Sequence, residues 1–391
     1  MRHPPLRICV LGDLESVHTR RWMQPFVERG HEVHAVSYYP PSSTTEGVTV
    51  HALTTGKAAA PEAPGTARTG RTIADRLPPT PLRLINALRY RRRGLADTVR
   101  RIQPHVLHAH YAVEYGFFAA TTGYHPLAVT AWGSDILVAA ERSRYARRIA
   151  RYALRRADLV TSNNEHMTRR IRDLGVPEEK AQTVVFGTER FFLEADDSVN
   201  QRSSPPDHPP TVISTRSLDS PLYNVDLVLK AMALVRRRLP DARLLVAGSG
   251  RLQPALERLP GQLGLSGAVT FLGFLDRAAF RDALASAHVY VSVPASDATS
   301  VSTLSAMAVG CFPVLSDLPT QHEWIEDGAN GLLVPVGDVD ALADGIVRAL
   351  ESEQLRRQAI ALNRRRVEER GLWENESLRM EELYYGLTDA R

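Results

Sequence analysis

A turn of small and acidic residues in the second half of the chain is the stretch best suited to chemistry. Ser296-Asp297-Ala298-Thr299-Ser300 follows the β-branched and aromatic run 289–293, and the residues after it are spaced like one face of a helix. Backbone N–H groups at the start of such a helix favour an anion such as phosphate. The same pattern also fits an ordinary helix cap, because Ser and Thr cap helices throughout α/β proteins.

Two histidines and two cysteines are further reactive side chains, and the apolar runs around them predict where they lie. His108 and His110 are two residues apart in an apolar run, so they point to the same face of a strand. No third metal ligand stands near them, which favours lining a cleft or packing. Cys9 and Cys311 lie in apolar runs and are expected in the core. We therefore expect no metal and no cofactor.

The segment around the 296–300 turn resembles the donor-binding core of the retaining glycosyltransferases of family 4. Those enzymes carry E-G-F-G-x-P-x-x-E-A-M-A, then G-x-P-V, D-G-x-N-G and P-x-D. The corresponding residues here run from Asp297 to Ala308 and continue through Pro313, 327–331 and Asp338. The resemblance implies a metal-independent enzyme that moves a sugar from a nucleoside diphosphate sugar to an acceptor hydroxyl.

The resemblance also implies roles for single residues. Arg216 matches an arginine that contacts the donor diphosphate, a task that suits its planar, permanently charged fork, although a surface or interdomain ion pair is the alternative. Asp297 replaces a glutamate that touches sugar hydroxyls, Ser305 replaces one that binds the ribose, and Tyr223 replaces a lysine. The expected donor-binding residues are Gly12, Trp132, Tyr223, Asn224, Gly248, Phe274, Thr299, Ser300, Val301, Ser302 and Ser305.

The first half of the chain supplies the remaining candidates. In VTAWGSD, Trp132 stands where many relatives carry a histidine, and it could stack on a sugar. Asp135 could bind a sugar hydroxyl or assist deprotonation, so it joins Arg216 and Asp297 as a predicted catalytic residue. A helix cap for Asp135 and a buried anchor for Trp132 are the alternatives. His18 and His110 are predicted to contact the acceptor.

Apolar runs of strand length alternate with helical patterns along both halves of the chain, which predicts two α/β domains with parallel sheets. The resemblance implies that these are the two facing Rossmann-like domains of the GT-B fold, with a cleft between them. The predicted ranges are 1–195, a polar and proline-rich linker 196–210, 211–370, and a helix 371–391 that crosses back to the first domain. A loop at 54–81 is expected near the acceptor.

The predicted strands are residues 6–11, 32–38, 106–109, 127–130, 159–162, 183–186, 211–215, 243–247, 269–272, 289–293, 312–315 and 332–335.

Charge is distributed unevenly between the two halves. Residues 1–195 hold 28 basic and 18 acidic side chains, a net charge of +10, whereas residues 196–391 have a net charge of −6. The arginine-rich stretch 144–156 could meet anionic lipid or an anionic acceptor, or it is simply a solvated amphipathic helix. We predict no nucleic-acid partner. The chain has no apolar run of membrane-spanning length and no signal-peptide pattern, so we expect a cytoplasmic protein, with peripheral contact at the inner membrane face as an option.

The interpretation is a retaining transferase acting by a front-face mechanism, because no carboxylate is clearly placed as a nucleophile. The acceptor is left open as a small molecule or a lipid-linked glycan. Two alternatives remain. One is a degenerate, non-catalytic binding partner, suggested by the departures at Trp132, Tyr223 and Ser305. The other is a GT-B nucleotide-sugar epimerase.

Overall fold

The computed structural model describes residues 3–54, 81–195 and 209–389, with the backbone alone for residues 81–91. The chain forms two compact units, each built on one parallel sheet. The first unit consists of the chain up to Asn163, Met167–Val184 and the residues from Ser377 onward, and the second of Asn164–His166 and Val185–Glu376. The predicted loop at 54–81 and linker at 196–210 lie almost entirely outside the described residues.

The first unit has a seven-stranded parallel sheet in the order β3-β2-β1-β4-β5-β6-β7. The strand order reverses between β1 and β4, and in open α/β sheets the carboxyl ends of the strands form a ligand crevice at such a point. The strands are β1 (Arg7–Leu11), β2 (Glu32–Ser37), β3 (Val48–Ala52), β4 (Val106–His110), β5 (Leu127–Thr130), β6 (Leu159–Ser162) and β7 (Ala181–Thr183).

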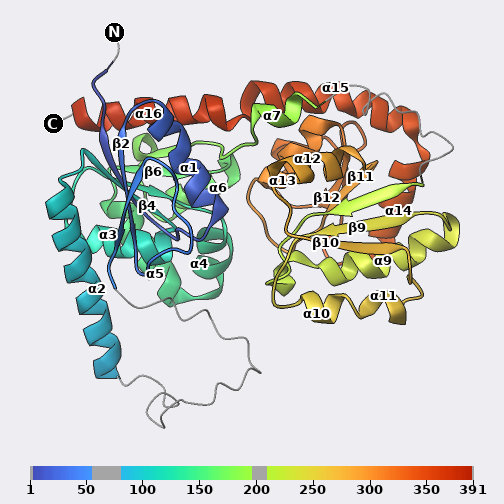
Figure 1. Ribbon diagram of the computed structural model, residues 1–391, viewed down its shortest axis with the longest axis horizontal. Helices are drawn as coiled ribbons and strands as arrows, with labels where there is room; N and C mark the ends of the chain where they lie inside the picture. Colours follow the sequence, from blue (N-terminus) through green and yellow to red (C-terminus); the bar gives the residue numbers. More distant parts are fainter. Residues whose placement is uncertain (1–2, 55–80, 196–208, 390–391) are drawn as a thin grey trace. The chain divides into compact units, whose positions relative to one another are not determined.

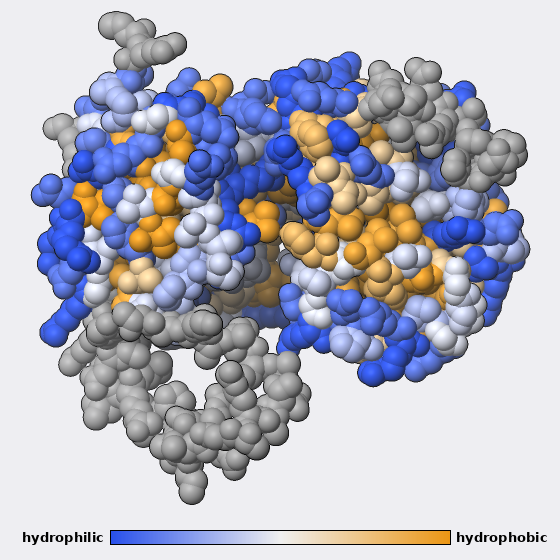
Figure 2. Space-filling model, viewed as in Figure 1, coloured by the Kyte–Doolittle hydropathy of each residue, from blue (hydrophilic) through white to orange (hydrophobic). Residues whose placement is uncertain are grey.

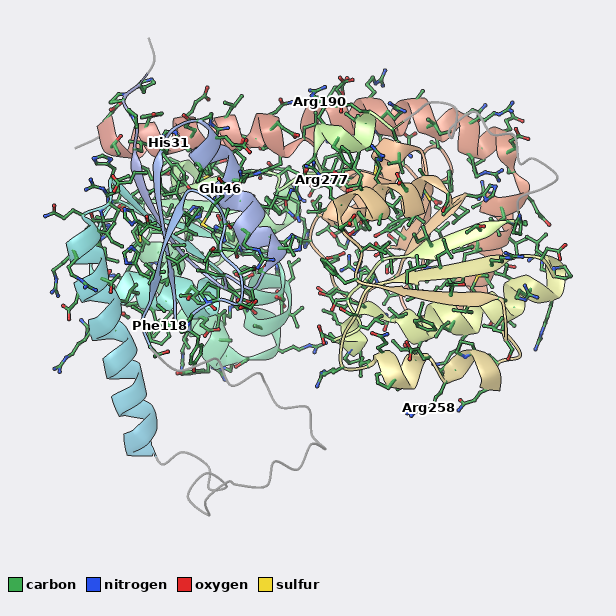
Figure 3. The ribbon with its side chains drawn as sticks, in the orientation of Figure 1. His31, Glu46, Phe118, Arg190, Arg258 and Arg277 are labelled. Atoms are coloured by element: carbon green, nitrogen blue, oxygen red, sulfur yellow. The ribbon has the colours of Figure 1, made fainter. Side chains whose placement is uncertain are left out.

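Helices cover both faces of this sheet (Figure 1). On one face, Tyr384 of α16 packs against Phe26 of α1 with ring centroids 5.4 Å apart. On the other face, α3 packs between α2 and α5. His31 lies beneath α16 (Figure 3) and bonds Glu381 at 2.8 Å.

The helices of the first unit are α1 (Val17–Glu28), α2 (Pro81–Ile102), α3 (Phe117–Thr122), α4 (Ala140–Arg142), α5 (Arg144–Arg156), α6 (Glu165–Asp173) and α16 (Trp373–Asp389), with short π-helical or 3-10 turns η2 (Ala112–Gly116), η3 (Ser134–Ala139) and η4 (Glu178–Lys180).

The second unit has a six-stranded parallel sheet in the order β10-β9-β8-β11-β12-β13. Its strand order reverses between β8 and β11, so a second crevice is expected at the carboxyl ends of these two strands. The strands are β8 (Thr211–Ser214), β9 (Arg243–Ala247), β10 (Val269–Gly273), β11 (Val289–Ser292), β12 (Phe312–Ser316) and β13 (Leu332–Val334).

Alternating strand residues build a core on each face of the second sheet. Val289 and Val291 pack in the core under α9 and α14, whereas Tyr290 packs in the core under α12, α13 and α15. Figure 2 shows hydrophobic residues gathered in the middle of the visible face of each unit and bordered by hydrophilic ones. The helices are α7 (Arg190–Leu193), α9 (Val225–Arg238), α10 (Gln253–Leu256), α11 (Leu259–Gln262), α12 (Arg277–Ala285), α13 (Val301–Val309), α14 (Val339–Glu351) and α15 (Glu353–Arg370), with 3-10 turns η5 (Pro221–Tyr223) and η6 (Gln321–Glu323).

The structure differs from the predicted organisation in three places. The strand expected at 183–186 is β7, which ends at Thr183, and the apolar residues after it are buried connecting chain. Strand β3 was not predicted. The second unit begins at Val185, because Phe192 of α7 packs in its core. In the part of the chain that the structure describes, no helix is both long and apolar enough to cross a membrane.

Candidate active site

The second unit brings two predicted segments together where its strand order reverses. Arg216 lies just beyond β8, and the 296–300 turn lies between β11 and α13. Since β8 and β11 are hydrogen-bonded neighbours in a parallel sheet, their carboxyl ends emerge at the same edge. The two predicted phosphate-binding elements therefore share one site.

Arg216 is held on three sides. Its Nη1 atom lies 3.0 Å from Oδ2 of Asp297 and donates a hydrogen bond to Oγ of Ser300 at 3.0 Å. Its guanidinium carbon lies 4.4 Å from the centre of the Tyr223 ring, a cation–π contact. Nε and Nη2 have no hydrogen-bond partner among the described residues. The guanidinium thus has a set position and one free edge of the kind that binds a phosphate through two parallel hydrogen bonds.

The charges of this group follow from its burial and its neighbours. Burial lowers the pKa of the Arg216 guanidinium, but the Asp297 carboxylate and the nearby rings of Tyr290 and Tyr223 raise it by more. Burial raises the pKa of the Asp297 carboxyl, while Arg216 works in the opposite direction. Arg216 therefore stays positively charged. Arg216 does form an ion pair, but Asp297 belongs to the same unit and both side chains are largely buried, so it is neither the surface nor the interdomain pair of the alternative. The pair leaves the free edge of the guanidinium unused.

Helix α13 adds the helix N-terminus that the sequence predicts. Ser300 is the N-cap, and its Oγ accepts a hydrogen bond from the backbone N–H of Thr303 at 3.4 Å. Val301 and Ser302 occupy the first turn, where no earlier carbonyl of the helix can accept their N–H groups. Because Ser300 also contacts Arg216, an anion at this helix end would lie beside the guanidinium.

Two residues that sequence reasoning missed hold the turn in place. The hydroxyl of Thr320 donates to the backbone carbonyl of Asp297 at 3.0 Å, and the indole N–H of Trp324 donates to Oγ1 of Thr299 at 3.3 Å. Both lie more than 20 residues further along the chain and carry no local signal. Thr299 is buried, so its side chain serves this contact.

Asn224 supports the site through the backbone. It adopts the left-handed conformation with φ of 52°, precedes α9, and donates from Nδ2 to the carbonyl of Val293 at 2.9 Å. Asn is among the few residues that accept this conformation readily. Its side chain therefore connects the start of α9 to the end of β11. The side-chain amide is used in this contact instead of the predicted contact with the donor.

Gly248 and Phe274 follow β9 and β10 at the same edge of the sheet. Gly248 has a φ of 141°, and a Cβ atom there would lie 2.6 Å from the carbonyl oxygen of Arg216. Only glycine therefore lets the two loops approach. Phe274 is 71% exposed, which leaves its ring free to contact a ligand.

Ser305 does not lie where the resemblance predicts. Its side chain is fully buried, bonds Oγ1 of Thr188 at 2.6 Å, and donates to the carbonyl of Val301 at 3.0 Å. The hydroxyl faces the interior of the second unit because Thr188, from a distant segment, covers it. The expected ribose contact of Ser305 is therefore corrected to a packing role.

The first unit assembles its predicted residues at the carboxyl ends of β1 and β4. A Cβ atom at Gly12 would lie 3.3 Å from the Thr19 side chain and 3.4 Å from Cβ of His110, so the loop passes close to both. The Trp132 ring lies 5.3 Å from the His110 ring and stacks with His18 at 5.7 Å. The predicted residues thus form one group at the point where the strand order reverses.

His110 and His108 differ in their partners. His108 is buried and bonds both Tyr384 and Thr130, so its role is structural. His110 is also buried, yet neither ring nitrogen has a hydrogen-bond partner within the described chain. Burial lowers the pKa of His110 to about 3, and the ring is therefore neutral at physiological pH. A neutral imidazole can exchange a hydrogen bond with a hydroxyl without attracting an anion.

Asp135 is fully buried and acts on the backbone. Oδ1 accepts N–H bonds from Trp132, Gly133 and Ile136 at 3.0–3.1 Å, and Oδ2 accepts one from Ala112 at 2.8 Å. Burial raises the pKa of the Asp135 carboxyl, and backbone N–H groups, among them those of Ala112, Gly133 and Trp132, oppose this. Asp135 is not the N-cap of the alternative either, because it lies inside η3, whose N-cap is Gly133. The predicted catalytic contact is corrected to the positioning of the Trp132 loop.

Among the described side chains, no three His, Cys, Asp or Glu residues gather closely enough to hold a metal ion.

Comparisons with known proteins agree with this architecture. A family model described as "Glycosyl transferase 4-like" matches residues 7–164, and one described as "Glycosyl transferases group 1" matches residues 196–366. Two structures are similar over 98% of this chain and nearly all of their own: HepE of Anabaena in complex with UDP (TM-score 0.75, 17% identity, 100% of that chain) and sucrose-phosphate synthase of Thermosynechococcus elongatus (0.77, 19%, 99%).

These likenesses and the two parallel sheets define a GT-B protein of two α/β units. The chain belongs to the glycosyl transferases group 1, the family 4 type.

Curated relatives match at lower coverage. The phosphatidyl-myo-inositol mannosyltransferase of Mycobacterium tuberculosis is 35% identical over 157 residues, which is 39% of this chain and 40% of that protein's length. The N-acetyl-alpha-D-glucosaminyl L-malate synthase of Bacillus anthracis is 24% identical over 304 residues, 74% of this chain and 77% of that protein. The chain thus aligns with less than half the length of the mannosyltransferase.

Proposed function

We propose that this protein is a retaining glycosyltransferase that moves a sugar from a nucleoside diphosphate sugar to an acceptor hydroxyl without a metal ion. The observation that carries the proposal is the guanidinium of Arg216, fixed by Asp297 and Tyr223 with one edge free beside the N-terminus of α13. Relatives and structural neighbours named for sugar transfer, or bound to UDP, support the same class of donor.

The second unit would bind the diphosphate and stabilise the charge that develops on it as the sugar departs. Arg216 would contribute its free edge and α13 its first N–H groups. Both are in place before the ligand arrives, so little reorganisation is needed. Asp297 would accept hydrogen bonds from sugar hydroxyls while holding Arg216, and Phe274 would contact the nucleobase.

The first unit would bind the acceptor. His110 is neutral, so it would bond an acceptor hydroxyl rather than a phosphate, and Trp132 with His18 offers stacked rings to a sugar face. In a front-face mechanism the leaving phosphate oxygen takes the proton from the acceptor hydroxyl. The oxygen–carbon bond to the acceptor forms on the side from which the phosphate leaves, which retains the anomeric configuration.

The test is turnover with a panel of nucleoside diphosphate sugars, with and without candidate acceptors, in the presence of a metal chelator. We expect nucleotide release that depends on the acceptor, survives the chelator and yields a product with the anomeric configuration of the donor, read by NMR. An inverted product or loss of turnover with chelator contradicts the mechanism. Donor binding without any turnover indicates a non-catalytic partner, and epimerised donor without acceptor indicates an epimerase.

A further inference from the structure

Helix α5 carries an unusual outer surface. Eight of its residues are exposed, and every one is arginine or tyrosine. They are Arg144, Tyr145, Arg147, Arg148, Arg151, Tyr152, Arg155 and Arg156, which we call the α5 basic face. The inner side, with Ala150, Ala153 and Leu154, is buried in the first unit. A merely solvated helix face commonly mixes both signs of charge, and this face contains no acidic residue.

The arginines of the α5 basic face are not neutralised within the described structure. None of the six forms an ion pair with a described carboxylate. The acidic residues nearest to α5 in the sequence have other partners: Glu141 is paired with Arg170 of α6, and Asp158 with His125. The face therefore presents six positive charges along 13 residues, a length of about 20 Å.

The two tyrosines give the face a second property. Tyr145 is 73% exposed and Tyr152 is 40% exposed. They are seven residues apart, so they lie on one line along the helix, with Arg148 between them. Tyrosines are enriched at membrane interfaces, where the ring contacts the headgroup region and the hydroxyl remains hydrated. Large exposed rings among arginines thus suit a lipid headgroup layer.

We propose that the α5 basic face docks the first unit on an anionic lipid bilayer. The attraction is electrostatic, because the apolar side of α5 is used inside the protein and cannot insert between acyl chains. The two exposed tyrosine rings along the face suit the headgroup layer of a bilayer, and this favours a lipid surface over nucleic acid. This proposal does not depend on the donor site of the second unit.

The test is cosedimentation of the full chain with two kinds of vesicle, phosphatidylglycerol mixed with phosphatidylcholine and phosphatidylcholine alone, at low and high salt. We expect binding to the anionic vesicles alone, lost at high salt through screening. The triple variant Arg148→Gln, Arg151→Gln, Arg155→Gln should lower the partition coefficient roughly tenfold or more. Tyr145→Ser should lower it by a smaller factor.

A matched control removes three exposed arginines of the second unit: Arg237→Gln, Arg243→Gln and Arg258→Gln, the last at the outer edge of that unit (Figure 3). It has the same net charge as the test variant and should bind vesicles like the wild type. Thermal unfolding of both variants checks that they fold. Equal recovery with both vesicle types, or equal losses in the two variants, overturns the proposal. Tighter binding to a DNA or RNA duplex than to anionic vesicles, abolished by the same α5 changes, overturns the choice of lipid.

Discussion

At the scale of single residues, the site depends on how Arg216 is oriented. An arginine side chain free in solution loses conformational entropy when it binds a phosphate, whereas Arg216 is already fixed by Asp297, Ser300 and the ring of Tyr223. Tyr223 stands where the resemblance expects a lysine, and the structure shows it supporting the remaining cation. The chain thus lacks the positive charge of the lysine, but the ring of Tyr223 fixes the position of the remaining cation, Arg216.

Replacement of Tyr223 tests this role. Tyr223→Ala removes the ring under the guanidinium and should weaken binding of a nucleoside diphosphate by about 1 kcal/mol, roughly fivefold. Tyr223→Phe keeps the ring face and should bind within about twofold of the wild type. Calorimetric titration with UDP and GDP measures both. Equal affinity for the Ala variant and the wild type would show that the ring does not position Arg216.

Ser305 leads to a prediction about stability. Ser305→Glu places a longer, charged side chain in a fully buried position next to Thr188, which should cost at least about 2 kcal/mol of unfolding free energy. Urea denaturation measures the change. Ser302→Glu, at a partly exposed position in the first turn of the same helix, is the control and should leave stability nearly unchanged. A stable Ser305→Glu protein with tighter nucleotide binding would restore the ribose contact that the resemblance implies.

His110 should make stability depend on pH. Its pKa is about 3 in the folded protein and near 6.5 when unfolded, so the unfolded state binds a proton first as the pH falls. Stability is therefore highest above pH 6.5 and declines below it, by roughly 2 kcal/mol for this residue at pH 5. Denaturation of wild type and His110→Phe between pH 7.5 and 5 should show a shallower decline in the variant. If the unfolding free energy of His110→Phe depends on pH as steeply as that of the wild type, a buried, neutral His110 is contradicted. The control is His322→Gln, a histidine replacement at an exposed position.

At the scale of elements, the site consists of loops that hold one another. The loop after β8 is contacted by the loop after β9 at Gly248, and the turn before α13 is fixed by Thr320 and Trp324 from beyond β12. Strand order places these loops at one edge of the sheet, and contacts across the edge set their shape. A change in one loop should therefore alter ligand binding at another.

Gly248→Ala tests the coupling between loops. The added Cβ would lie 2.6 Å from the Arg216 carbonyl, at a φ that L-residues rarely adopt, so we expect at least about 2 kcal/mol of destabilisation and weaker nucleotide binding. Gly261→Ala in α11 meets no atom within 4 Å and should be neutral or slightly stabilising. Urea denaturation and calorimetry measure the two effects. Wild-type behaviour of Gly248→Ala would show that the loops adjust independently.

At the scale of the whole molecule, the alternation of strands and helices predicted two parallel α/β units, and most strand positions agree within a residue or two. The misplaced strand shows the limit of the pattern. Val184 and Phe186 are buried in connecting chain where the second unit begins. A short run of apolar residues marks such a buried connection as well as it marks a strand, so the sequence pattern does not distinguish the two. The sequence predicted that the second domain begins at residue 211. In the structure its main segment begins at Val185, because α7 is buried in the core of the second unit.

The candidate site was predictable to the level of its segments, but not of its contacts. Arg216 and the 296–300 turn were found through an ordered motif. The Tyr223 ring beneath the guanidinium, the burial of Ser305 by Thr188 and the four N–H bonds to Asp135 all depend on residues that come together in space. No local spacing encodes such contacts, since they follow from the strand order and the loops.

The most direct test of the account is calorimetric titration of a nucleoside diphosphate into the wild type, Arg216→Ala and Arg243→Ala. Arg243 is an exposed arginine on the neighbouring strand β9 and controls for the loss of one positive charge. We expect Arg216→Ala to lose about 2 kcal/mol or more of binding free energy, roughly 30-fold in affinity, while Arg243→Ala binds like the wild type. Equal affinities for all three proteins would contradict the placement of the diphosphate at Arg216 and α13.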